Sequence, residues 1–142
     1  MQRGTTMNRI TLSILDYKRI YKSINKAEES KSISEQEAQS LAKELEQAKI
    51  IMPEEMPDDV VTMNSVVKIT FPKTEKQIQL KIVYPSEANL KENLISIFSP
   101  IAAALIGYKV GDTIDWIVAS GPTQICIDEI IYQPEASGDF DL

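Results

Sequence analysis

Residues 94–112 read LISIFSPIAAALIGYKVGD and decide the fold expected for this chain. Leu94–Phe98 is apolar and β-branched, which predicts a strand. Ser99 and Pro100 follow it with the residue types that open helices, because a serine hydroxyl accepts an otherwise unpaired N–H and proline has none to leave unpaired. The next run, Ile101–Ile106, is almost wholly apolar and predicts a short helix that is buried on most sides.

Glycine and alternating apolar residues extend this pattern. Gly107 suits the end of the short helix, because glycine adopts the left-handed conformation found there without strain. Gly111 and Asp112 predict a turn into the next strand. Short strands near ten-residue spacing around one short helix are typical of a small antiparallel α+β domain. The strands are expected at Val60–Phe71, Gln77–Tyr84, Leu94–Phe98, Thr113–Val118 and Thr123–Tyr132, and Pro134–Leu142 is expected to be an acidic tail.

The first third of the chain has helical rather than strand periodicity. Apolar residues recur at helical spacing after Ser13, with Asp16 three residues on as in a variant capping box, and predict a helix over about Ile14–Ala27. A second narrow apolar stripe predicts a helix over about Glu35–Ile50 that Pro53 ends. Two such helices joined by a short polar loop are expected to pair as an antiparallel hairpin of the coiled-coil type.

The change of period divides the expected structure into two parts. Residues 8–52 form the helical hairpin, Met52–Asp59 is the linker, and residues 53–142 form the sheet domain. At ~1.5 Å per residue the hairpin reaches only about 20–25 Å. Residues 1–27 carry a net charge of +5 and residues 28–59 a net charge of −7, so ion pairs across the two helices are expected to help orient them.

Composition excludes several classes of function. The chain has no histidine and one cysteine, Cys126, which removes the commonest general base and ordinary zinc sites, so we expect no catalytic residue, metal or cofactor. The lone cysteine fits a reducing cytoplasm. No apolar run approaches the ~20 residues of a membrane span. The net charge of −6 argues against binding nucleic acid directly.

Three separated runs carry a family resemblance. They are the opening stretch, Met56–Ser65 and Tyr132–Asp139. In this order they resemble the C-terminal domain of the bacterial Gre transcript-cleavage factors and, within that family, the Rnk branch, named for regulation of nucleoside diphosphate kinase. The resemblance covers residues 8–142 and is firm from Met52. It implies an FKBP-like fold for residues 53–142.

The resemblance also implies a partner and a mode of action. It points to a transcription elongation regulator that binds RNA polymerase on the β′ rim of the secondary-channel entrance and competes with other channel factors. DNA and RNA would be met only through the polymerase. The resemblance assigns polymerase binding to Phe98, Ser99 and Pro100. Gre factors have an acidic residue just before the Ser-Pro pair, where this chain has Phe98, and the pair can serve simply to start the helix.

The acids expected at the hairpin tip are Glu28, Glu29 and Glu35. In Gre factors tip acids are thought to hold Mg²⁺ in the polymerase active centre, and this chain lacks the Gre tip signature. Solvated charges, metal delivery and a polymerase contact are the three interpretations of these acids. Two alternative functions follow for the whole chain, a Gre-type cleavage factor or a protein regulator of nucleoside diphosphate kinase.

Overall fold

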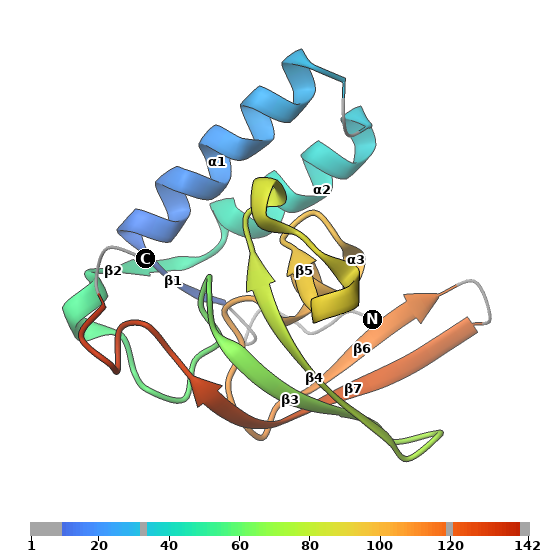
Figure 1. Ribbon diagram of the computed structural model, residues 1–142. Helices are drawn as coiled ribbons and strands as arrows, with labels where there is room; N and C mark the ends of the chain where they lie inside the picture. The colour runs from blue at the N-terminus through green and yellow to red at the C-terminus, as the bar shows by residue number, and fades with distance from the viewer. Residues whose placement is uncertain (1–9, 32–33, 119–120, 140–142) are drawn as a thin grey trace.

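A five-stranded sheet forms one side of the molecule and a pair of helices the other (Figure 1). The computed structural model describes residues 10–31, 34–118 and 121–139. This mixed α+β architecture confirms the fold class. The strand order is β5-β4-β3-β7-β6. The strands are β3 (Val66–Phe71), β4 (Lys76–Val83), β5 (Leu94–Ser96), β6 (Thr113–Val118) and β7 (Gly121–Tyr132).

The sheet is not wholly antiparallel, contrary to the expectation. β3 is antiparallel to β4 and β7, and β6 is antiparallel to β7, but β5 runs parallel to β4. Two 3₁₀ turns, Pro85–Glu87 and Leu90–Glu92, carry the chain back so that β5 begins beside Lys81, in the second half of β4. Asn93 adopts a left-handed conformation there and its side chain donates to the Gln79 carbonyl at 3.0 Å, which sets the new direction.

Three helices occur in the described residues at the three expected places. They are α1 (Ile14–Glu29), α2 (Glu35–Glu46) and α3 (Pro100–Leu105). The expected end of α2 at Ile50 is wrong, because Lys49–Ile51 forms a short strand, β2, parallel to β1 (Thr11–Ser13). The β-branched pair at the end of β2 gains more from this ladder than from a helix. The two-stranded sheet thereby ties the base of α2 to the start of α1.

One hydrophobic core serves both the helices and the sheet. Ile20 and Ile24 of α1 and Leu45 of α2 belong to the same buried cluster as Ile82 of β4 and Ile127 of β7. The hydrophobic core is therefore not divided between residues 52 and 53. The assignment of two domains on either side of this point stays a prediction. The FKBP-like description of the sheet and the coiled-coil description of the helix pair also stay predictions.

The first expected strand is built differently from the prediction, and the expected linker contains one local element. The stretch Pro53–Glu55 forms a 3₁₀ turn and Met56 after it is buried, while most of Met52–Asp59 is exposed, so its role as a linker stays a prediction. Val60–Ser65 is not part of β3. Its residues are all buried, and its backbone bonds to the Ser65 hydroxyl, to the loop after α3 and, at its end, to Ile82 of β4.

Gly107 connects three segments at the end of α3. Its N–H donates to the Val61 carbonyl at 2.8 Å, and its own carbonyl accepts from the Thr11 N–H at 3.1 Å. Its φ of +84° is the left-handed conformation expected of a glycine here. A Cβ at this position would lie 2.5 Å from the Cβ of Ile10, so the site excludes any side chain.

We expect Gly107→Ala to lower the free energy of unfolding by about 1–3 kcal/mol or more, because it adds a steric clash to backbone strain. Gly111→Ala is the matched control. Gly111 also has a positive φ, of +95°, but nothing lies within 4 Å of its added Cβ. Urea denaturation of both variants measures the difference in the free energy of unfolding. Equal losses of stability in the two variants would show that the structure relieves the clash with Ile10.

Candidate functional site

The Phe98–Pro100 corner lies between β5 and α3 at the surface. Phe98 and Ser99 are half-buried and Pro100 is exposed at the first position of α3. Ser99 does not cap α3 with its hydroxyl as expected. Ser96 shapes the corner instead, since its Oγ accepts from the Phe98 N–H at 3.0 Å and its carbonyl from the Ser99 N–H at 2.8 Å. The backbone conformation of the corner is therefore fixed by Ser96, which the sequence pattern predicts as a strand residue.

A hollow of about 270 Å³ separates this corner from α1. One wall is the side of α1 that faces the corner, and the other is the chain from Tyr84 to Ser86 together with Phe98. Aromatic rings and serine hydroxyls line it, and Lys26 is its one cation. A space of this size suits one large side chain of a partner or a very small ligand. The lining residues are Ser23, Lys26, Ala27, Ser30, Tyr84, Pro85, Ser86 and Phe98.

A buried carboxylate lies behind the hollow. Asp16 is fully buried, and its Oδ2 accepts from the Met63 N–H at 3.1 Å. Burial first, and then the charge of Glu135, raise the pKa of Asp16 to about 7, although the Met63 N–H, Arg19 and Tyr84 act in the opposite direction. Asp16 therefore changes protonation near neutral pH in the folded protein.

Tyr84 joins the hollow to this carboxylate. It lines the hollow, and its hydroxyl oxygen is buried. Burial is the main cause that raises the pKa of the Tyr84 phenol, and the nearby Asp16 carboxylate adds to it. The Tyr84 phenol at the hollow and the Asp16 carboxylate of α1 are therefore electrostatically coupled.

The C-terminal segment starts packed against the rest of the molecule: Pro134 and Glu135 are buried, contrary to a free acidic tail, whereas residues 136–139 are exposed. Gln133 Nε2 donates to the carbonyls of Pro57 and Val60, each at 2.7 Å. Glu135 is buried and accepts from the Thr62 hydroxyl at 2.8 Å, while burial raises its pKa. Residues 140–142 of the expected tail lie outside the described residues. No local sequence signal predicts the hydrogen bonds of Gln133 or the burial of Glu135.

The acids of the hairpin tip lie on the surface. Glu28 and Glu29 end α1 and Glu35 begins α2, and all three are exposed. Within residues 10–31, 34–118 and 121–139 no three Asp, Glu, Cys or His side chains are grouped so that they could hold a metal ion. In the same residues no helix is long and apolar enough to cross a membrane.

Comparison with known proteins identifies the family. Residues 56–132 match the family model for the C-terminal part of transcription elongation factors GreA and GreB. The chain is 41% identical over 105 residues to the regulator of nucleoside diphosphate kinase of Escherichia coli K12, covering 72% of this chain and 76% of that protein. It is 33% identical over 107 residues to the transcription elongation factor GreA of Helicobacter hepaticus, covering 75% of this chain and 66% of that factor.

A solved structure agrees with these matches. The GreA/GreB elongation factor of Nitrosomonas europaea superimposes with a TM-score of 0.69 at 32% identity, covering 87% of this chain and 98% of that one. The chain belongs to the GreA/GreB family of transcription elongation factors, as the three sequence motifs predicted. Its relatives include the Rnk-type regulator of Escherichia coli.

We expect stability to fall as pH rises from about 4 to about 7. In that window the unfolded chain has lost the Asp16 proton, with its ordinary pKa of 3.8, while the folded chain keeps it. The free energy of unfolding should decrease by up to about 1.4 kcal/mol per pH unit from this group. Thermal unfolding across the range measures the slope.

Asp16→Asn should flatten this slope, leaving only the smaller contribution of Glu135 in the same direction. The exposed Asp58 provides the matched control, Asp58→Asn, which should keep the slope of the unmodified protein. A slope that is unchanged in Asp16→Asn would show that Asp16 is ionised throughout the range.

Proposed function

We propose that this protein is a transcription elongation regulator that binds RNA polymerase at the secondary-channel entrance, on the rim of the β′ subunit. The observation that carries the proposal is the Phe98 corner, a half-exposed aromatic beside an open hollow, in a chain of the GreA/GreB family. Ser99 and Pro100 complete the contact surface. DNA and RNA would be reached only through the polymerase, and the protein would act in the cytoplasm.

The corner has the properties of an interface anchor. An aromatic ring that becomes fully buried on binding contributes a large apolar area at little entropic cost. Phe98 supplies such a ring, and the adjacent hollow accepts a side chain from the partner. Lys26 at the edge of the hollow favours a partner that presents a carboxylate there.

The proposed action is occupation of the channel entrance without chemistry. Helix α1 has 16 residues and α2 has 12, so at ~1.5 Å per residue the pair extends only about 18–24 Å. A metal held for catalysis also needs ligands fixed by neighbouring groups, and Glu28, Glu29 and Glu35 are solvent-exposed. The protein would therefore compete with longer channel factors and would not replace them.

A second candidate is regulation of nucleoside diphosphate kinase, which the name of the Escherichia coli relative states for that protein. Purified kinase mixed with this protein distinguishes the two. We expect polymerase to bind and kinase activity to stay unchanged, and the opposite result would favour the second candidate.

Truncation of the anchor should weaken polymerase binding. We expect Phe98→Ala to raise the Kd for core RNA polymerase about 30-fold, which corresponds to about 2 kcal/mol. Leu90→Ala is the matched control, since Leu90 is an apolar side chain with 79% exposure that lies outside the corner. Fluorescence anisotropy measures both, with thermal unfolding as the check on folding. Binding that is unaffected by Phe98→Ala would place the contact elsewhere.

The protein should not stimulate transcript cleavage. When it is added to backtracked elongation complexes, we expect cleavage at the polymerase-only rate, and reduced cleavage when a Gre factor is also present, because both would occupy one entrance. Gel analysis of the 3′ fragments measures this. Extra cleavage that disappears in Glu28→Ala or Glu35→Ala would instead support metal delivery by the tip.

A further inference from the structure

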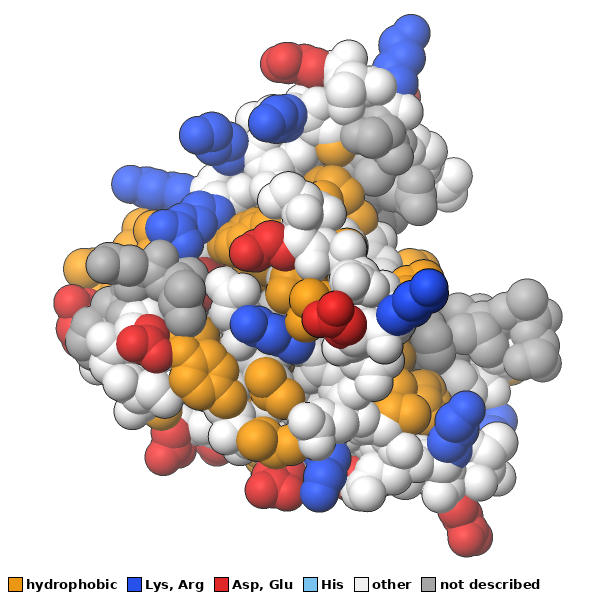
Figure 2. Space-filling view, viewed as in Figure 1, with side chains coloured by type: hydrophobic (Ala, Val, Ile, Leu, Met, Phe, Trp, Pro, Cys, Tyr) orange, Lys and Arg blue, Asp and Glu red, His pale blue; other side chains and the backbone are white. Residues whose placement is uncertain are grey.

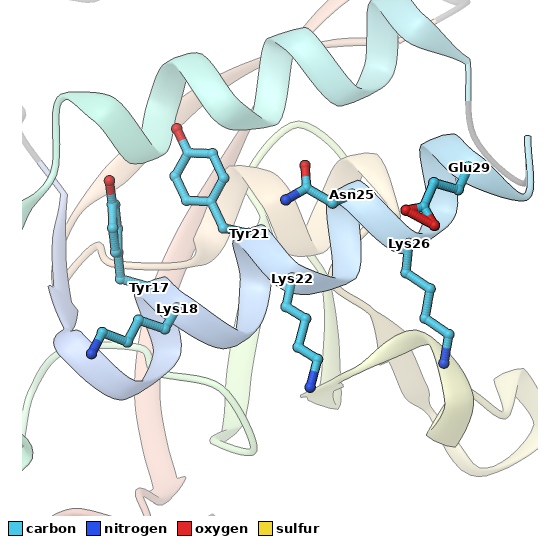
Figure 3. Close-up of a pocket in the computed structure, with 7 residues that line it drawn as sticks. All are labelled: Tyr17, Lys18, Tyr21, Lys22, Asn25, Lys26 and Glu29. Atoms are coloured by element: carbon cyan, nitrogen blue, oxygen red, sulfur yellow. The ribbon is translucent and has the colours of Figure 1, made fainter.

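Helix α1 carries an exposed basic face next to the Phe98 corner. Lys18, Lys22 and Lys26 recur every fourth residue, so their Cα atoms follow one another at about 6 Å along the helix. Lys and Arg side chains gather over α1 in Figure 2. The three lysines do not form the expected ion pairs with the described part of α2, because their side chains point away from α2 (Figure 3). Among the described residues none of the three has a carboxylate within 4.0 Å.

A shallow groove of about 780 Å³ runs along this face. The lysines form one edge, and Tyr17 and Tyr21 form the other edge on the side toward α2 (Figure 3). The two rings meet edge to face with their centroids 5.1 Å apart, and the Tyr21 hydroxyl donates to the Ala42 carbonyl at 3.4 Å. The groove thus has a fixed apolar wall opposite a row of mobile cations.

We propose that this groove binds an acidic amphipathic helix of a partner protein. Carboxylates repeated every fourth residue on such a helix have the same spacing as the three lysines, and an adjacent apolar stripe would lie against the tyrosine rings. Rows of opposite charge beside an apolar seam set the orientation of paired helices.

The chemistry favours a protein over a nucleic acid. The chain has a net charge of −6, which repels a polyanion, and the residues that line the groove include Glu29 beside the three lysines. Single-stranded nucleic acids bind through open aromatic faces on which bases stack. Tyr17 and Tyr21 are packed against each other and Tyr21 is bonded to α2, which holds both rings in place.

This inference goes beyond the proposed function, because it concerns the groove along α1, which among the described residues shares Lys26 alone with the lining of the hollow beside Phe98, and because its test does not require polymerase. The full chain, labelled with ¹⁵N, is titrated with a synthetic amphipathic helical peptide that has glutamate at every fourth position and leucine beside it. We expect amide shifts centred on residues 17–29. A peptide with lysine in place of glutamate should give no such shifts.

Charge reversal separates this site from general electrostatics. Lys18→Glu, Lys22→Glu and Lys26→Glu together should weaken peptide binding about tenfold or more. The control combines Lys76→Glu, Lys91→Glu and Lys109→Glu, three exposed lysines elsewhere, and has the same net charge. It should bind as the unmodified chain does, and circular dichroism checks the helix content of both.

Three results would overturn the proposal. The first is that millimolar peptide shifts no amide signals in residues 17–29. The second is that the control variant weakens peptide binding as much as the charge reversal on α1 does. The third is that a single-stranded oligonucleotide shifts the same amide signals at a lower concentration than the peptide. Lys18→Glu with Lys22→Glu, which leaves Lys26 of the hollow intact, shows separately, when mixed with polymerase, whether the partner of the groove is the polymerase. If the unmodified chain fails to bind polymerase, the proposed function fails and the peptide titration still decides the role of the groove.

Discussion

The hydrogen bond from the Met63 N–H to the buried carboxylate of Asp16 is the contact on which the arrangement of helices and sheet depends. It joins the first turn of α1 to the segment that precedes β3. A carboxylate without solvent is costly unless it is paired or takes up a proton, and the raised pKa of Asp16 shows that the proton is part of the balance. The Ser13 hydroxyl accepts from the Asp16 N–H at 3.0 Å and holds the same residue from the helix side.

A second buried acid completes this connection from the C-terminal side. Glu135 accepts a hydrogen bond from the hydroxyl of Thr62, the residue before Met63. The Gln133 side chain donates to the carbonyls of Pro57 and Val60. The segment from Pro57 to Ser65 is thereby held between α1 and the end of the chain. Its buried backbone needs these side chains, because it has no strand partner of its own along most of its length. Such networks specify one arrangement when their members are satisfied.

Both proposed binding surfaces depend on the same arrangement. The hollow beside Phe98 exists only because α1 lies at a set distance from Tyr84–Ser86, and the groove along α1 faces outward only because the opposite face is buried in the common core. Lys26 borders both. A partner that binds at the corner and along α1 would therefore contact two neighbouring surfaces built on one common core.

The sequence by itself determined the elements whose signals are local. Ser13 and the apolar spacing after it predict α1, and Pro100 and Gly107 delimit α3. Period-two alternation predicts β4 to within one residue at each end, and β6 has the expected bounds, Thr113–Val118. The three family motifs likewise depend only on residues close together in the chain. Side-chain periodicity and helix ends are decided within a few residues, so sequence reasoning reaches them.

Only the tertiary structure decided features that join distant residues. β2 replaces the end of α2 because Lys49–Ile51 pairs with residues 11–13, and β5 turns parallel because of the route through Asn93. Asp16 has the sequence position of a capping residue, yet its side chain turns inward to a backbone group 47 positions away. Burial of Glu135 follows in the same way from Thr62, 73 positions earlier. No local pattern encodes such contacts, because their free energy arises only when packing excludes water from both partners.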